Sequence, residues 1–313
     1  MAMTRAPMTR ILYRMPNLAS TSPGKVPALF SGHVSTHTRQ NSFLATPDSE
    51  VTCSLLAHST GHDVATLTIN NPLKLNILTR PIVTSLIDHC RTLSTSPTLR
   101  AVVLTGGPVA AGKPPAFIGG ADIREMHALS APAEARSFIK HLHAACQALR
   151  DLPVPVIARI NGMCLGAGLE VAASCDLRIS TKVSRFAMPE VAIGIPSVIE
   201  AALLPGLIGF GRTRRLLMLG EIIGADEAEK WGLVEKVVED EKQLDHVVAD
   251  WVGRLVRNGS QAVRSQKRLI RSWEECGVNE GVQTGIEAFG EAFENDGVEP
   301  REKMAAFLGR KSV

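Results

Sequence analysis

Apolar residues recur along this chain with two periods, one typical of strands and one typical of helices. β-rich runs at 51–56 and 64–69 flank a polar turn, which predicts an opening hairpin. Further short apolar runs that end at turns predict buried strands at 101–105, 156–160, 177–180 and 184–188. Because these strands alternate with helical segments, the pattern predicts an α/β fold with crossover connections.

Helical periodicity begins at Thr79, whose hydroxyl group suits the N-cap position, and continues with apolar residues to Leu93. The last third of the chain changes character, because amphipathic helices are expected there, at 226–231, 240–256, 261–273 and 280–293. The pattern therefore divides the chain into an α/β core over residues 48–240 and a helical region over residues 241–313.

An apolar stretch at 191–210 is the candidate for a membrane span. Pro196, Glu200 and Pro205 interrupt this stretch, and a charged residue at the centre of a membrane helix is costly. We therefore expect a buried loop and helix here, and no membrane span.

The first 47 residues differ in composition from the rest of the chain. The first acidic residue is Asp48, whereas several Arg and Lys residues precede it, and the segment is rich in Ser, Thr, Met and Pro. Such a segment is expected to be disordered. Its Arg-rich, acid-free composition is typical of a transit peptide and predicts a protein of the mitochondrial matrix. The alternatives are a disordered tail without a targeting role, and a peroxisomal or cytoplasmic location.

The charge balance and the cysteine pattern argue against several classes of function. The chain has 34 Lys and Arg residues against 31 Asp and Glu residues, and 4% of its residues are aromatic, so no nucleic-acid groove is expected. The six cysteines form no C-x-x-C pair, which favours reduced, mostly buried thiols over a zinc site or a disulfide framework. His141 and His143 lack a third ligand in the sequence, so we interpret this pair as part of a surface helix.

Two glycine-rich turns, at 117–122 and 161–170, each follow a predicted strand and lead into a predicted helix. The first N–H groups of a helix have no partner within the helix, so two of them can converge on one oxygen and form an oxyanion hole. Neither turn matches the dinucleotide-binding fingerprint. Taken singly, either set of glycines is explained by close packing of a helix on a strand.

Two carboxylates lie near these turns. Glu170 falls in the first turn of the second predicted helix, and Glu190 follows Pro189, which fixes the backbone that leads into it. Two carboxyl groups beside an anion hole can hold one water molecule, with one group accepting a proton and the other donating one. Taken singly, each glutamate has an ordinary explanation, as a helix-dipole residue or as a surface acid.

From residue 51 to the C-terminus, the chain resembles the crotonase superfamily, and the enoyl-CoA hydratases within it. The matching motifs are N-P-L-K-L-N at 71–76, F-I-G-G-A-D at 117–122, N-G-M-C-L-G-A-G-L-E at 161–170, M-P-E at 188–190 and the segment 225–238. Glu170 and Glu190 also keep the 20-residue separation of hydratases that carry both glutamates. In combination these motifs are highly specific.

The resemblance implies a spiral of β-β-α units and a C-terminal helical trimerisation region, in a homotrimer or a dimer of trimers. It also implies that the N–H groups of Gly119 and Ala167 bind the thioester oxygen, while Glu170 and Glu190 activate water and handle the proton at the α-carbon. The residues implied in substrate binding are Lys74, Leu75, Gly119, Gly120, Ala121, Asp122 and Ala167. No metal or other cofactor is implied, because CoA is part of the substrate.

These features predict a lyase, an enoyl-CoA hydratase that adds water across the double bond of a 2-enoyl-CoA in fatty-acid or branched-chain acyl-CoA degradation. Retention of both glutamates favours hydration over a Δ3,Δ2-enoyl-CoA isomerase, which needs one well-placed base. A hydratase of a specialised biosynthetic pathway is also open. From a different class, an RNA-binding crotonase-fold protein is disfavoured by the low aromatic content and the balanced charge.

The chain departs from the family pattern at two places. Ala167 replaces the central glycine of a G-G-G run, which preserves the N–H donor if this residue has ordinary helical geometry, as we expect at the start of a helix. The segment 194–202 is one residue shorter than the glycine-rich stretch usual in hydratases and carries Ser197 after its proline. This second change puts the acyl specificity in doubt.

Glu200 is a third carboxylate, within that altered segment. Because a buried, unpaired acid is costly, we expect Glu200 to pair with an arginine such as Arg212, Arg214 or Arg215. The alternative hypothesis is that Glu200 faces the acyl pocket and favours a polar or branched acyl chain.

Overall fold

The computed structural model describes residues 50–57 and 61–309. The predicted leader over residues 1–47, with its proposed transit function, lies outside the described residues. The same holds for residues 58–60 of the predicted hairpin turn and for residues 310–313.

Two β-sheets form the centre of the described part. The larger sheet contains, in spatial order, β1 (Glu50–Ala57), β2 (Asp63–Asn70), β3 (Leu99–Gly106), β5 (Val156–Ile160), β7 (Leu177–Thr181) and β10 (Lys236–Val238). The smaller sheet contains β4 (Ala116–Ile118), β6 (Met163–Leu165), β8 (Arg185–Ala187) and β9 (Ile223–Gly224). β1 and β2 form the predicted antiparallel hairpin, and β2, β3, β5, β7 and β10 run parallel, which confirms the α/β class.

Helices connect the strands and complete the chain. They are α1 (Arg80–Ser94), α2 (Ile123–His127), α3 (Pro132–Arg150), α4 (Ala167–Ala173), α5 (Leu204–Leu219), α6 (Ala225–Trp231), α7 (Glu241–Arg257), α8 (Ser260–Glu275), α9 (Val278–Glu291) and α10 (Val298–Leu308). Short 3-10 helices are η1 (Pro72–Lys74), η2 (Glu190–Ile193), η3 (Ile199–Leu203) and η4 (Asn295–Gly297). The amphipathic helices predicted in the last third are confirmed as α6 to α9, within two residues at each end. α10 was not predicted.

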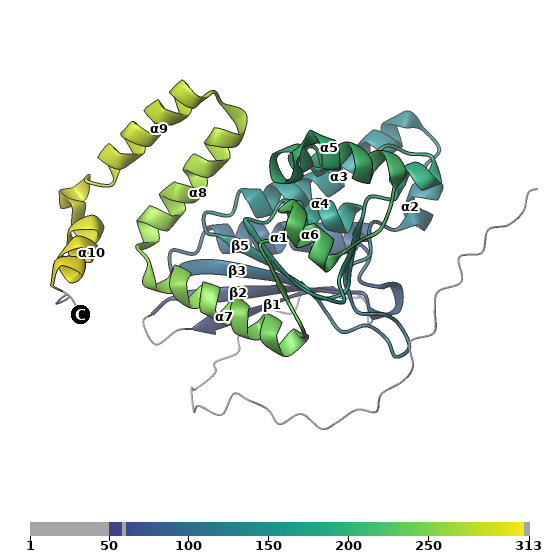
Figure 1. Ribbon diagram of the computed structural model, residues 1–313, viewed down its shortest axis with the longest axis horizontal. Helices are drawn as coiled ribbons and strands as arrows, with labels where there is room; N and C mark the ends of the chain where they lie inside the picture. Colours follow the sequence, from purple (N-terminus) through teal and green to yellow (C-terminus); the bar gives the residue numbers. More distant parts are fainter. Residues whose placement is uncertain (1–49, 58–60, 310–313) are drawn as a thin grey trace, which may run out of the picture. The chain divides into compact units, whose positions relative to one another are not determined.

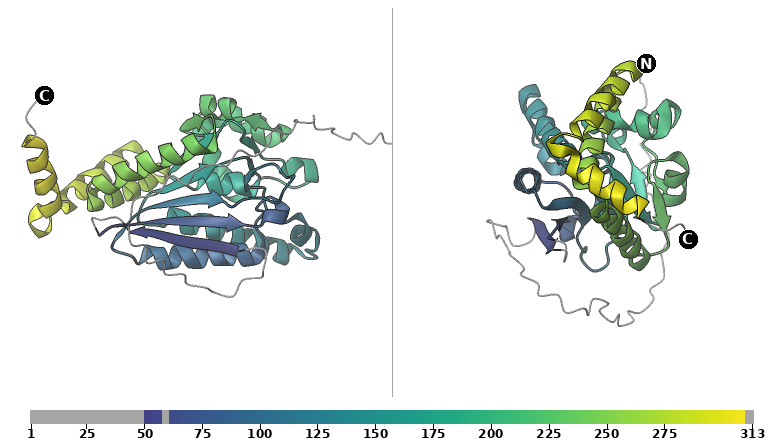
Figure 2. Two further views of the ribbon diagram at one scale, coloured as in Figure 1. Left: turned by 90° about the horizontal axis from the view of Figure 1, so that it is seen from below. Right: turned by 90° about the vertical axis from the view of Figure 1, so that its left-hand side faces the viewer.

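Helices cover both faces of the larger sheet (Figure 1, Figure 2). Consecutive residues of β3 point to opposite faces, so Val103 packs with Leu244 and Val248 of α7, whereas Leu104 belongs to the apolar cluster that contains Leu86 of α1. Because β3 is buried on both faces, its central residues 101–104 are all apolar rather than alternating.

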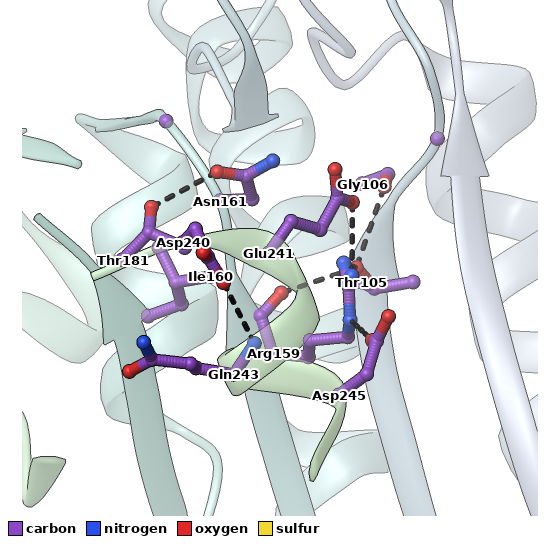
Figure 3. A network of polar contacts seen from close by, with 12 residues as sticks. Thr105, Gly106, Arg159, Ile160, Asn161, Thr181, Asp240, Glu241, Gln243 and Asp245 are labelled. Carbon is purple, nitrogen blue, oxygen red and sulfur yellow. Dashed lines mark hydrogen bonds and ion pairs between the residues drawn. The ribbon is translucent and has the colours of Figure 1, made fainter. Parts of the chain in front are cut away.

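Arg159 of β5 attaches α7 to the sheet (Figure 3). Its Nη2 donates a hydrogen bond of 2.8 Å to Glu241 Oε1, and its Nε donates one of 2.7 Å to Asp245 Oδ1. The Thr105 hydroxyl of β3 donates to the Arg159 carbonyl at 3.1 Å. A charged side chain in an otherwise apolar strand therefore has a structural role, as the link between sheet and helix.

The second helix of the C-terminal region, α8, is joined to the core by a buried lysine. Lys267 of α8 donates hydrogen bonds of 2.9 Å to the Val154 carbonyl and 2.8 Å to Asp176 Oδ2. Beyond α8, the following helix α9 carries a row of exposed apolar side chains, which are Val278, Val282, Ile286 and Phe289. The helical character expected of the C-terminal region is thereby confirmed.

Two local expectations are wrong. Thr79 occupies the N-cap position of α1, yet its hydroxyl makes no capping hydrogen bond to the described helix. Residues 191–196 are exposed rather than buried, because the chain turns through η2 at the surface before η3 returns it to the core at Glu200. The described residues contain no helix that is both long and apolar enough to cross a membrane.

Candidate active site

The two glycine-rich turns predicted as a pair of helix starts lie against each other. A methyl group added at Gly168 of α4 would lie 2.2 Å from the Ile118 carbonyl oxygen of β4, so the start of α4 packs directly on the end of this strand. Similarly, a methyl group at Gly120 would lie 3.3 Å from the Leu165 carbonyl oxygen. These glycines therefore permit the close approach that brings the two turns together.

The two predicted oxyanion donors differ in their present hydrogen bonds. Ala167 is the first residue of α4 and does not have a positive φ, so the expected helical geometry is confirmed. Because it begins the helix, its N–H has no acceptor within the helix. The Gly119 N–H instead donates a hydrogen bond of 2.9 Å to the Leu75 carbonyl. Gly119 can therefore serve a ligand oxygen only after this bond is released or shared.

Glu170 lies in the first turn of α4 and is 4% exposed. Its Oε1 accepts a hydrogen bond of 3.2 Å from the Ala201 N–H of η3. Burial, followed by the nearby charges of Glu190 and Glu200, raises the pKa of Glu170 from its ordinary value of 4.5 to about 8, despite the opposing effect of the Ala201 N–H. Glu170 is thus a protonated carboxylic acid at neutral pH.

Glu190 approaches the start of α4 from the other side. Gly166 has a φ of +54°, a backbone conformation that requires glycine, and a methyl group here would lie 2.6 Å from Glu190 Oε1 and displace that carboxylate. Ser197 Oγ donates a hydrogen bond of 2.9 Å to Glu190 Oε2. The predicted pair of carboxylates is therefore brought to one place, between α4 and the segment 190–201.

The residues implied in substrate binding lie in two loops that are bonded to each other. Lys74 Nζ donates a hydrogen bond of 3.0 Å to Asp122 Oδ2, which joins the first motif to the second. Burial acts to raise the pKa of Asp122, but hydrogen bonds from Lys74 and from the Arg124 N–H outweigh it and lower this pKa. Leu75 and Ala121 lie in the same loops, where Ala121 is bridged to Leu78.

Glu200 does not pair with the expected arginines. Its Oε1 lies 2.7 Å from His143 Nδ1 of α3, so the preferred prediction for Glu200 is wrong, and His143 contributes to the surroundings of the site. Two of these arginines have other partners: Arg212 donates a hydrogen bond to the Trp231 carbonyl, and Arg215 pairs with Glu221 and Glu227. Helical periodicity placed His143 on a helix but gave no sign of a partner 57 residues away.

The six cysteines are free thiols, as predicted, and four of them are buried. Among them, Cys146 of α3 lies beside Glu200, and burial together with the charge of Glu200 raises its pKa well above the ordinary value. A thiol with a raised pKa is not a reactive nucleophile. This cysteine therefore belongs to the packing around the carboxylates.

Comparison with known proteins identifies the family. The family model described as Enoyl-CoA hydratase/isomerase matches residues 59–313. A short-chain-enoyl-CoA hydratase of Clostridium acetobutylicum is 34% identical over 251 residues, which cover 80% of this chain and 93% of that protein. A crotonyl-CoA hydratase of Syntrophomonas wolfei is 33% identical with the same coverage, and a mevalonyl-coenzyme A hydratase of Beauveria bassiana is 31% identical, covering 72% of this chain and 84% of that protein.

Solved structures agree with the sequence relatives. An enoyl-CoA hydratase of Mycobacterium smegmatis matches with a TM-score of 0.74 at 28% identity, covering 82% of this chain and 95% of that one. DspI of Pseudomonas aeruginosa matches with a TM-score of 0.75 at 31% identity, covering 86% of this chain and 96% of that one. The chain belongs to the enoyl-CoA hydratase/isomerase family. The crotonase-type fold and the enzyme class predicted from the motifs are confirmed.

Proposed function

We propose that the protein hydrates a 2-enoyl-CoA and that Glu170 and Glu190 are the pair that holds the water and moves its proton. The observation that carries this proposal is a buried Glu170, with a pKa of about 8, beside a second carboxylate. Such a pair shares one proton at neutral pH and therefore offers an acid and a base in one place. Relatives named as hydratases of short-chain enoyl-CoA and crotonyl-CoA support the same reaction.

In the proposed reaction, the water oxygen bonds to the β-carbon while one of its protons moves to the ionised carboxylate. The carboxylic acid gives its proton to the α-carbon, so the pair begins and ends the reaction with one proton. Glu170 is the protonated member in the free protein, because its pKa lies above neutral pH. Ser197 holds the carboxylate of Glu190 in place.

Negative charge develops on the thioester oxygen during this addition. The Ala167 N–H at the start of α4 is a fixed donor for that oxygen. The Gly119 N–H becomes the second donor when its bond to the Leu75 carbonyl gives way to the substrate. We propose that Lys74, Leu75 and residues 119–122 bind the CoA thioester, and that no metal or other cofactor takes part.

The test is an absorbance assay that follows loss of the conjugated thioester of crotonyl-CoA. We expect turnover by the parent protein and a loss of at least about 10²-fold in kcat for Glu170→Gln and for Glu190→Gln, since each change removes one proton-transfer group. The matched control is Glu239→Gln, a surface carboxylate paired with Lys182, which should retain parental kcat. Parental turnover that survives either glutamine substitution would contradict the assignment.

For assembly, we propose a homotrimer or a dimer of trimers. Supporting this, Val278, Val282, Ile286 and Phe289 recur on one face of α9 and are 57% to 84% exposed, an arrangement suited to burial against a second copy of the chain. Light scattering should give a multiple of three chains, and Ile286→Glu should reduce it, whereas Gln283→Glu on another face should not. A monomeric parent would contradict this assembly.

We propose further that the leader directs the protein to mitochondria, as its Arg-rich, acid-free composition suggests. The bacterial relatives give no support for this location. Residues 1–50 fused to a fluorescent reporter should carry it into mitochondria, and replacing Arg5, Arg10 and Arg14 by glutamine should leave the reporter in the cytoplasm. A cytoplasmic parent fusion would favour the cytoplasmic alternative.

A further inference from the structure

Glu200 is a buried carboxylate next to the proposed catalytic pair and outside the proposed proton transfer. Its side chain is 6% exposed, and its Oε1 lies 2.7 Å from His143 Nδ1, whose side chain is 50% exposed. Its Oε2 is buried, and the neighbour that the described residues offer this carboxylate besides His143 is the Cys146 thiol, a weak donor. A buried carboxylate with one weakly bonded oxygen lowers the stability of the folded protein. Its place beside the site therefore indicates a function other than stabilisation.

The backbone connects Glu200 to Glu170 directly. Glu200 and Ala201 are consecutive in η3, and the Ala201 N–H donates to Glu170 Oε1 at 3.2 Å. The contact with His143 holds the Glu200 side chain against α3 and thereby fixes the position of the Ala201 N–H. η3 packs against both α3 and α4, so the three residues belong to one contiguous contact.

We propose that Glu200, anchored by His143, is a positioning residue for the reaction, which holds the Ala201 N–H against Glu170 and places a second carboxyl group beside it. This inference rests on the proposed function of Glu170. It assigns to Glu200 neither contact with substrate nor a proton-transfer step.

The charges around Glu200 support this assignment. α3 contributes His143 and Cys146 and α4 contributes Glu170, which also lies within reach of the charge of Glu190 in η2. No arginine of α5 joins them among the described contacts, because Arg212 and Arg215 have the partners given above and Arg214 lies over the Phe210 ring at 5.6 Å. The field at Glu170 is therefore mainly that of carboxylates, and Glu200 is one of the charges that raise its pKa.

The two contributions of Glu200 can be separated by substitution. Glu200→Gln keeps an oxygen that can accept from His143 but removes the negative charge. Glu200→Met removes the charge and also the unsatisfied oxygen, replacing the side chain by an apolar one of similar length, so this variant is expected to fold even if the glutamine variant does not. Glu200→Asp keeps the charge and shortens the reach to His143.

The experiment is the pH profile of kcat/KM for crotonyl-CoA hydration, because this ratio reports the ionisation of the free enzyme. The parent should lose activity as the pH rises through about 8, where Glu170 loses its proton. Glu200→Gln and Glu200→Met should move this basic limb to lower pH by about 0.5–1 unit, since removal of a nearby negative charge favours ionisation of Glu170. Glu200→Asp should keep the limb near that of the parent while kcat falls.

The matched control is Glu227→Gln on α6, a carboxylate 3.1 Å from Arg215, which should leave the limb in place. A basic limb that stays at the parental pH in both neutral variants overturns the inference, even when hydration itself is confirmed. An inactive parent would instead count against the proposed function. In that case the role of Glu200 is tested by infrared titration of the Glu170 carboxyl group, whose band is identified by its absence in Glu170→Gln. The midpoint of this titration should lie at lower pH in Glu200→Gln than in the parent. An unchanged midpoint overturns the role of Glu200.

Discussion

Ser197 Oγ donates a hydrogen bond of 2.9 Å to Glu190 Oε2. Ser197 follows Pro196 at the place where the family pattern has a glycine. The hydroxyl instead gives one of the two carboxylates a fixed partner seven residues along the chain. The altered segment is thereby compatible with the proposed pair, since a carboxylate held by a donor is better aimed than a free one.

Replacement of Ser197 by alanine should lower kcat for hydration by about ten-fold with little change in stability. The lost hydrogen bond to a charged group amounts to roughly 1.5–3 kcal/mol at full strength, and partial exposure of Glu190 lets water replace part of it. Ser197→Thr, which keeps the hydroxyl group, should retain more activity than Ser197→Ala. Equal kcat in the parent and the alanine variant would show that Ser197 does not position Glu190.

Gly166→Ala should reduce hydration by at least about 10²-fold, because two independent constraints meet at this residue. The added methyl group would lie 2.6 Å from Glu190 Oε1, and the φ of +54° is strained for any residue with a side chain. Gly211→Ala, in α5 with open space at the added methyl position, is the control and should keep parental kcat. Activity of Gly166→Ala near the parental level would show that Glu190 can occupy another position.

Glu170→Gln should be more stable than the parent, and the difference should grow with pH. The pKa of Glu170 is raised from 4.5 to about 8 on folding, so between these values the folded protein binds more protons than the unfolded chain and loses stability as the pH rises. The gain should be about 1 kcal/mol near pH 5 and reach roughly 4–5 kcal/mol by about pH 8.5. Denaturant unfolding at both pH values checks this, and a gain independent of pH would contradict the raised pKa.

Lys267→Met should destabilise the protein by about 2–4 kcal/mol, because it leaves Asp176 and the Val154 carbonyl without a buried cationic donor. Arg254→Met removes an exposed pair with Asp250 one helical turn away and should cost less than about 1 kcal/mol. The comparison by denaturant unfolding separates buried from surface ion pairs. Equal effects of the two substitutions would mean that α8 is not held to the core through Lys267.

Much of the fold could be predicted from the sequence, because the signals are local. Buried parallel strands contain an uninterrupted apolar run, residues 101–104 in β3, and the helices from α6 to α9 have clear periodicity. The start of α4 and the place of Glu170 in its first turn followed from the glycine-rich turn before them. Periodicity did not indicate that residues 191–196 turn outward, since an apolar run looks alike whether it is buried or lies at an exposed rim.

The sequence predicted which residues belong to the site better than it predicted the contacts between them. Motif positions identified Glu170 and Glu190, and the structure brings them within electrostatic reach of each other. The contact of His143 with Glu200 joins residues 57 positions apart, and no local pattern encodes such a pairing. The bond from Gly119 to Leu75 likewise depends on how two loops meet, and it could not be inferred from the motif that contains Gly119.

The central claim, addition of water by a two-carboxylate site, is tested most directly by turnover of crotonyl-CoA in D₂O with analysis of the product by mass spectrometry and NMR. We predict a 3-hydroxyacyl-CoA that carries one deuterium at C2, formed by the parent protein and lost in both Glu170→Gln and Glu190→Gln. Recovery of unhydrated enoyl-CoA with deuterium exchanged into C2 or C4 would contradict hydration and would identify proton transfer of the isomerase type.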